Sequence, residues 1–257
     1  MDPTAIELGG STVLRPTRDP ADWVQILEAD PGLAGALPEG TRGDAALFAL
    51  AMTRWLEPGE WSPDPETGDG AGQLGLLVLD GFMVRHVQVI DRPPAELFGP
   101  GDLLHPWEPD HCEPFDAGVR WDVLEMTRVA VLDRRFAALI SRWPDLVAAL
   151  VARAIARSRS LLLNLAISQL VGVDIRLLVQ LWHIAQRWGF RDAAGCVVPV
   201  HLTHQLLANL ISAQRPTVTS ALAVLSEQGR LTRRRDGLIV LHGDPPTEFR
   251  HLRSTLP

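Results

Sequence analysis

The amino-acid sequence predicts an α+β protein: an antiparallel β-roll comes first, one long helix follows, and a small helical domain closed by a hairpin comes last. Two observations predict this order. Up to Asp133, short apolar runs alternate with Gly- and Pro-rich turns, which favours antiparallel strands. After Asp133, apolar residues recur with a period near 3.6, which is typical of helices.

The same patterns divide the chain into four segments. Residues 1–43 mix Pro, Gly and Asp with a short apolar stretch, and predict a poorly packed lead-in with one helix. Residues 44–143 are expected to form the β-roll, residues 144–171 the long helix, and residues 172–257 the C-terminal domain.

Composition restricts the class of protein. Hydrophobic residues make up 46% of the 257 residues and charged residues 21%, so the chain can bury a core and is not disordered throughout. Its two cysteines, Cys112 and Cys196, suit a reducing compartment better than a disulfide framework. We find neither a signal peptide nor an apolar run of ~18 residues, and therefore expect a cytoplasmic protein without a membrane partner.

The roll should begin within residues 44–56, as a strand or a short helix. Residues 57–72 are rich in Pro, Gly and Asp and predict a loop. Asp80-Gly81 interrupts the apolar run 74–89 and predicts a hairpin turn, because both residues tolerate positive φ. Residues 95–107 and 121–133 supply further short strands.

A long helix should open at Pro144, whose missing N–H is not needed at a helix start, and run to about Leu170. Its apolar residues recur at steps of three, four or seven, as in a coiled-coil seam. We expect this seam to form a homodimer interface, and the alternative is that the helix packs only on its own roll. The interface would contain Val147, Leu150, Ala154 and Leu161.

Two short helices are predicted beyond a helix at 175–188, which Asp174 can cap and Gly189 ends. Thr203 can cap the first, Ile211 to Ala213 make the turn, and Pro216 lies near the start of the second. This spacing predicts a helix-turn-helix, whose second helix enters the major groove of DNA. Its buried face would contain Val218, Ala221, Leu222 and Leu225.

The side chains left outside suit nucleic acid. Arginine can bond both acceptors of guanine, and Gln, Thr and Ser can contact bases or phosphates. Residues 226–243 predict a hairpin wing that turns at Asp236-Gly237 and carries three arginines suited to phosphate. Residues 174–257 hold 10 Arg against 6 acidic residues, within a chain of net charge −7. The predicted DNA-binding residues are Thr203, Gln214, Arg215, Thr217, Thr219, Ser220, Arg233, Arg234 and Arg235.

The order of these elements, with the segments RWPDL, VDIR and LTHQLLANLISAQRPTVTSALAVL, resembles the cyclic-AMP receptor protein/Fnr family of bacterial transcription regulators. The resemblance implies a cyclic-nucleotide-binding-like roll, a homodimer through the long helix, and two-fold DNA sites read by Arg215 with Gln214, Thr217 and Ser220 nearby. A regulator of this kind could also contact RNA polymerase.

The expected effector site departs from that family. Members that bind cyclic nucleotides carry a Gly-Glu pair and an Arg-Ser or Arg-Thr pair after a segment like FGPGDLL, and both pairs are missing here. Arg120 is the only arginine there, among carboxylates that would repel a phosphate. We therefore expect no cyclic-AMP binding, and the alternative is a different small molecule or a metal in the roll.

A metal is the weaker of these alternatives. His105, His111 and Cys112 lie near Glu108 and Asp110, and all are metal-ligand types. Their spacing matches no standard zinc pattern, and a polar surface loop explains them better. We therefore predict neither a metal site nor a cofactor.

Two other classes of protein remain as alternatives. An enzyme is disfavoured because the sequence has no Gly-rich phosphate loop, no GxSxG and no HExxH motif, and because His183 and His204 fall on helices, where packing or a surface position explains them. An interaction module that has lost DNA binding would not require Arg215 beside an arginine-rich wing. The sequence thus predicts a sequence-specific DNA-binding regulator that is not an enzyme.

Overall fold

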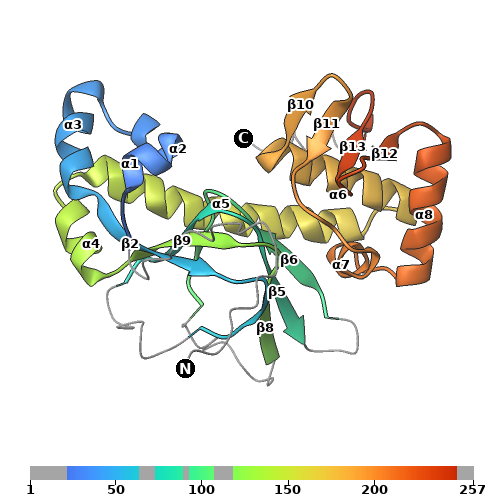
Figure 1. The fold of residues 1–257 in the computed structure, drawn as a ribbon, viewed down its shortest axis with the longest axis horizontal. Coiled ribbons are helices and arrows are strands. Elements are labelled where there is room, and N and C mark those ends of the chain that lie inside the picture. Colours follow the sequence, from blue (N-terminus) through green and yellow to red (C-terminus); the bar gives the residue numbers. More distant parts are fainter. Residues whose placement is uncertain (1–21, 64–72, 89–92, 107–117, 248–257) are drawn as a thin grey trace, which may run out of the picture.

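The computed structural model describes residues 22–63, 73–88, 93–106 and 118–247 of the chain. The molecule is elongated: one long helix runs along it, with short N-terminal helices at one end, a β-roll in the middle and the C-terminal domain at the other end (Figure 1). Among the described residues, no helix combines the length and the apolar character needed to cross a lipid bilayer.

The helices follow the predicted order, but the N-terminal end has three helices where the sequence predicted one in the lead-in segment. They are α1 (Ile26–Ala29), α2 (Pro31–Gly35), α3 (Glu39–Phe48), α4 (Arg134–Ile140), α5 (Pro144–Ser168), α6 (Val173–Trp188), α7 (His204–Leu210) and α8 (Arg215–Glu227).

The strands form three antiparallel sheets, two in the roll and one in the C-terminal domain. The first sheet has the order β1 (Asp22–Gln25), β2 (Leu50–Leu56), β9 (Thr127–Leu132), β4 (Gly75–Asp80), β7 (Leu103–Leu104). The second has the order β3 (Gly59–Trp61), β8 (Gly118–Val123), β5 (Met83–Gln88), β6 (Ala95–Phe98). The third has the order β10 (Phe190–Asp192), β11 (Gly195–Val198), β13 (Ile239–Leu241), β12 (Leu231–Arg233).

The predicted α+β class, with an antiparallel roll, a long helix and a C-terminal winged helix-turn-helix, is confirmed. The two roll sheets enclose a buried apolar cluster to which both sheets contribute their inward-facing residues. This cluster contains Leu76, Val78, Met83, Phe98, Leu104, Trp121, Val123, Val129 and Val131.

The predicted hairpin at Asp80-Gly81 is wrong, although the chain does turn there. Gly81 has φ +83°, and its N–H donates to the Asp80 carboxylate at 3.0 Å. However, β4 pairs with β7 and β9, whereas β5 pairs with β6 and β8. The turn is therefore a corner that carries the chain from one sheet to the other.

The expectation of a poorly packed segment is wrong for residues 22–43, which form β1, α1, α2 and part of α3. Ile26 and Leu33 are completely buried. The Asp30 carboxylate caps α2 by accepting from the Leu33 N–H (3.2 Å), and it also accepts from Arg153 of α5. Residues 44–56, expected as a strand or a short helix, contain both the end of α3 and β2. Residues 1–21 lie outside the described residues.

The long helix is confirmed, but its inner face differs from the predicted seam. Leu150 is 2% exposed and Val147 packs beside it, both against the first roll sheet and the N-terminal helices. Leu150 is therefore covered by its own chain, whereas Val147 is only partly buried. The outer face of α5 instead exposes large apolar side chains, namely Val151, Ile155, Leu161, Leu162 and Leu165.

The C-terminal domain packs directly on the roll. Helix α6 begins at Val173 after Gly172, which has φ +91°, so Asp174 lies in the first turn and is not the cap that we predicted. At its other end, the Trp188 indole donates to the Pro100 carbonyl (3.0 Å), and its ring meets Phe82 edge to face at 5.5 Å between centroids.

A salt bridge and an apolar cluster extend this contact. Arg187 pairs with Asp102, whose carboxylate also accepts from the Gly99 N–H at 3.0 Å. Val84 and Leu97 of the roll share one buried cluster with α6, α7 and α8. The roll and the helix-turn-helix are therefore held in one relative orientation.

Gly99 lies at the tightest point of this contact, and Gly99→Ala should destabilise the protein. A Cβ there would lie 2.6 Å from Phe82 and 2.7 Å from Trp188, so one of the rings must shift. We expect a loss of about 1–3 kcal/mol of unfolding free energy, measured by thermal or denaturant unfolding.

The matched control is Gly43→Ala. Gly43 lies inside α3 with nothing within 4 Å of an added Cβ, so this change should stabilise by about 0.5–1 kcal/mol. Equal stability of Gly99→Ala and wild type would show that the ring contact is loose.

Candidate nucleic-acid interface

The helix-turn-helix is built from local signals that the sequence displays. The Thr203 side chain accepts from the Leu206 N–H (3.1 Å) and caps α7. Ser212 in the turn has φ +53°, and the extended Gln214 precedes α8, which has Pro216 in its first turn. The cap satisfies a backbone donor and the proline removes one, so the two helices begin where predicted.

The two helices cross over a small residue and share one core. Ala208 is fully buried, and its carbonyl accepts from the Ala213 N–H (2.9 Å), which closes the turn. The predicted buried face of α8 is observed, since each of its four residues is at most 8% exposed: Val218, Ala221, Leu222 and Leu225.

The opposite face of α8 presents the polar side chains that the sequence singled out. Thr219 and Ser220 donate their hydroxyls to the carbonyls four residues earlier, at 3.1 and 3.3 Å, so these hydroxyls remain available only as acceptors. Arg215 is exposed at the first position of the helix. The residues gathered on this exposed surface are Gln214, Arg215, Thr217, Thr219 and Ser220.

The wing has the predicted geometry, but its arginines are not equivalent. Gly237 has φ +87° and Asp236 accepts from the Leu238 N–H at 3.1 Å, which forms the turn between β12 and β13. Arg234 is paired with Asp192 at 3.2 Å and with Asp236 at 3.1 Å. Arg233 and Arg235 are exposed and have no ion pair within the described residues.

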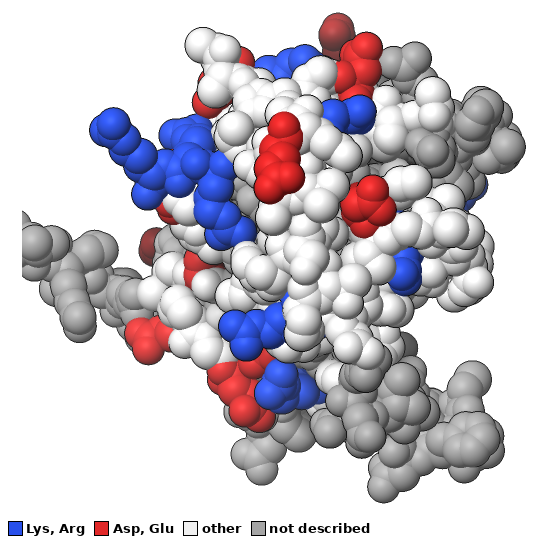
Figure 2. Space-filling model, turned by 90° about the vertical axis from the view of Figure 1, so that its right-hand side faces the viewer, with Lys and Arg blue, Asp and Glu red and all other residues white. Residues whose placement is uncertain are grey.

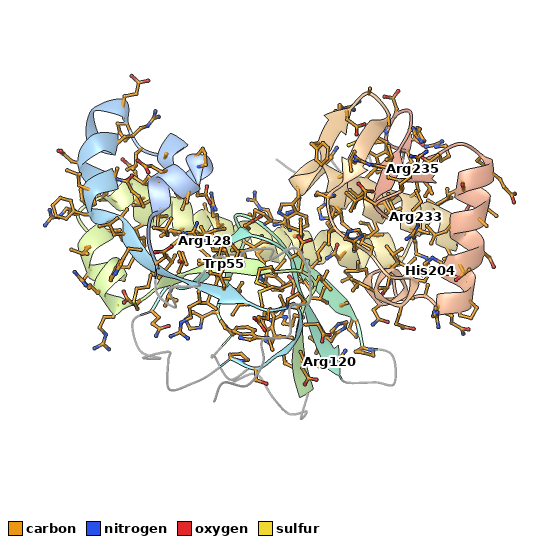
Figure 3. The ribbon with its side chains drawn as sticks, in the orientation of Figure 1. Trp55, Arg120, Arg128, His204, Arg233 and Arg235 are labelled. Carbon is orange, nitrogen blue, oxygen red and sulfur yellow. The ribbon has the colours of Figure 1, made fainter. Side chains whose placement is uncertain are left out.

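Arginines gather on one side of the C-terminal domain. Figure 2 shows a group of basic side chains projecting from one edge of this end of the molecule, with isolated acidic residues nearer the middle. In Figure 3, Arg235, Arg233 and His204 lie in a column beside α8. The wing and the helix-turn-helix thus present one surface with concentrated positive charge.

His204 is a residue of this surface that the sequence interpretation missed. Its Nδ1 lies 2.9 Å from the Thr219 hydroxyl oxygen, which connects the first residue of α7 to the outer face of α8. The available signal was its position, immediately after the Thr203 cap and beside the predicted interface.

His183 has a different role, although it also lies on a helix. Burial, and then the nearby Arg187 charge, lowers its pKa to about 4, and its Nε2 lies 3.3 Å from the Ser160 hydroxyl. It is therefore neutral at physiological pH and packs α6 against α5.

The segment of the roll in which the sequence offered metal-ligand side chains, residues 105–112, lies only partly within the residues that the structure describes. His111 and Cys112, with Glu108 and Asp110, lie outside the described residues, and the residues that are described contain no group of three metal-ligand side chains. Arg120 pairs with Asp122 at 3.1 Å. The same carboxylate lies 3.1 Å from His86, whose pKa is lowered chiefly by burial.

Comparisons with known proteins agree with this geometry. Residues 175–244 match the model of the Crp-like helix-turn-helix domain. No curated protein matches the chain in sequence.

Solved structures share the fold over most of the chain. A CooA mutant from Carboxydothermus hydrogenoformans has 16% identity and a TM-score of 0.57, covering 90% of this chain and 94% of its own. FixK2 from Bradyrhizobium japonicum has 18% identity and a TM-score of 0.54, covering 79% and 96%. A CRP-family transcriptional regulator from Thermus thermophilus has 19% identity and a TM-score of 0.53, covering 78% and 95%. At such identities the likeness concerns the fold.

Proposed function

We propose that this chain, whose residues 175–244 match the Crp-like helix-turn-helix domain, is a Crp/Fnr-like, sequence-specific DNA-binding transcription regulator. The observation that carries the proposal is the exposed polar face of α8, with Arg215 at its first position, beside a wing with two arginines that form no ion pair in the described part of the chain. This arrangement suits base edges for α8 and phosphates for the wing. We expect no enzymatic activity, and we expect the protein to act in the cytoplasm and to contact RNA polymerase there.

We propose further that the regulator is a homodimer on two-fold DNA sites. Four exposed apolar side chains on the outer face of α5 support this proposal. They follow one another at steps of four, seven and three residues, as in a coiled-coil seam, and are Val151, Ile155, Leu162 and Leu165. Leu162 (66% exposed) and Leu165 (59% exposed) are the most open members, and Val151 and Ile155 continue the seam. A two-fold dimer would present its two α8 helices to half-sites about one DNA turn apart.

We propose that cyclic AMP is not an effector of this protein. Besides the missing sequence pairs, Arg120 already forms an ion pair with Asp122, so its charge is not free for a phosphate. The alternatives are a different small molecule or a metal in the roll, no effector, or an interaction module that has lost DNA binding.

Selection from random duplexes tests the proposal. The purified full chain should enrich a two-fold motif, and its affinity for that motif should fall steeply with salt because bound phosphates release counterions. Adding cyclic AMP should change neither the motif nor the affinity. Retention of random and selected duplexes alike would contradict sequence-specific binding, and retention of none would favour the interaction module.

A further inference from the structure

An ion pair stands on the inner face of the second roll sheet, next to the buried apolar cluster. Alternate residues of a strand share one face of its sheet, so Arg85 lies on the same face as Met83, and Glu96 on the same face as Phe98. Arg85 and Glu96 are partners in the strand register, and their side chains form an ion pair of 2.9 Å. The carboxylate is only 11% exposed, so it requires compensating positive charge.

Helix α5, which passes the roll on its way to the C-terminal domain (Figure 1), supplies a second positive charge. Arg157 Nη2 lies 2.7 Å from the Glu96 Oε2 atom that Arg85 also contacts. Its Cζ atom lies 3.8 Å from the centre of the Phe98 ring, a distance that favours a cation–π contact. The Glu96 carboxylate and the Phe98 ring thus form a cation site in the roll, and Arg157, with a side chain 19% exposed, fills it.

The roll residues that follow this site are held by the same helix and by α6. Arg153 of α5 donates to the Gly101 carbonyl at 2.9 Å. The Asp102 carboxylate and the Pro100 carbonyl are held by the α6 contacts described above. Segment 96–102 therefore joins the roll both to the long helix and to the first helix of the C-terminal domain.

On the basis of the proposed DNA-binding function, we propose that Arg157 takes the place of an effector. Its guanidinium joins the roll to α5, so that the C-terminal domain keeps its DNA-binding orientation without a bound small molecule. A cation that is part of the chain cannot be lost by dilution, because its binding to the site is intramolecular. DNA binding is then constitutive.

Arg157→Ala removes the cation and leaves its site open beside Glu96 and Phe98. The C-terminal domain should then adopt other orientations as well, and the apparent DNA affinity falls with the fraction of molecules in the binding orientation. We expect about tenfold weaker binding to the selected duplex, since one charged contact typically contributes a factor of this size. Fluorescence anisotropy measures the affinity of exhaustively dialysed protein. Dialysed wild type should bind with an affinity that a small-molecule extract of cells does not increase.

The missing fragment of the side chain can be supplied in solution as ethylguanidinium. At millimolar concentration it should restore most of the affinity that Arg157→Ala loses. Ethylammonium at the same concentration and ionic strength has the same charge but lacks the flat fork of a guanidinium, so it should restore much less. The wild type should respond to neither cation, because its site is already filled.

Two further variants complete the test. Arg159→Ala is the matched control, because Arg159 is exposed on the same helix, and it should bind DNA as wild type does, with or without ethylguanidinium. Glu96→Gln nearly preserves the shape of the side chain but leaves two arginines without their shared carboxylate. It should also weaken DNA binding, and ethylguanidinium should not restore it. This variant tests the inference even where Arg157→Ala does not fold, which thermal unfolding monitors.

The possible results separate this inference from the proposed function. Three results overturn the role of Arg157 and leave the regulator intact: dialysed wild type that binds only after the extract is added, variants at Arg157 and Glu96 that bind as tightly as wild type or more tightly, and a loss in Arg157→Ala that ethylguanidinium does not restore. Absence of specific binding by wild type, with and without the extract, overturns the proposed function itself.

Discussion

Leu162→Glu is expected to convert the proposed homodimer into a monomer. Leu162 is 66% exposed on α5, so the change costs the folded monomer little. In a two-fold dimer it would place two carboxylates in the apolar seam with no partner, at a cost of about 3–5 kcal/mol each. The dimer dissociation constant should therefore rise at least about a hundredfold.

Light scattering at micromolar concentration measures this change, and DNA binding should weaken with it because one half-site is lost. The control is Leu47→Glu on α3, since Leu47 is 67% exposed and α3 lies at the end of the molecule opposite the C-terminal domain (Figure 1). Leu47→Glu should remain dimeric. A dimeric Leu162→Glu would place the interface elsewhere.

Leu150→Glu would not serve this purpose. Leu150 is 2% exposed among the side chains that join α5 to the first roll sheet. A charge there would unfold the monomer, and any loss of the dimer would be secondary.

The second large expected effect is a loss of DNA affinity, and its dependence on the DNA sequence distinguishes base contacts from phosphate contacts. Arg215 lies at the first position of α8, where a side chain in the major groove can reach guanine N7 and O6. Arg215→Ala should cost about 1–3 kcal/mol on the selected duplex and relax the preference at one base pair per half-site. Its affinity for scrambled duplex should change much less.

Arg235→Ala should weaken selected and scrambled duplexes by a similar factor, and should make the salt slope shallower by about one for each half-site. Arg234→Ala, on the same wing, is the matched control. Its guanidinium is already shared between Asp192 and Asp236, so its removal should cost less than removal of Arg235.

Anisotropy titrations on both duplexes measure all three variants. If Arg215→Ala binds the selected duplex as tightly as wild type, α8 is not the recognition helix. If Arg215→Ala and Arg235→Ala each reduce the affinity for the selected and the scrambled duplex by the same factor, Arg215 is another phosphate contact. Specificity would then rest on Gln214, Thr217 and Ser220.

The sequence by itself determined the features that depend on neighbours along the chain. Thr203 and Pro216 mark the starts of α7 and α8, and Asp236-Gly237 marks the wing turn, because caps and turns are satisfied within a few residues. The helical period of the apolar residues likewise predicted α5 and the buried face of α8, because this period is also a property of neighbouring residues in the chain.

Only the tertiary structure decided which partner each of these elements meets. Helix α5 is apolar on several sides, so its period could not show that Leu150 faces the roll while Leu162 stays exposed. Asp80-Gly81 predicts a turn, but long-range pairing assigns the flanking strands to different sheets.

Which polar and charged side chains of the interface are paired depended on the same long-range packing. Arg234 is neutralised by Asp192, which is 42 residues away in the chain, and His204 meets Thr219 across the turn of the helix-turn-helix. Local patterns cannot contain such contacts, because the energy of an ion pair or a hydrogen bond depends on distance in space and not on separation along the chain.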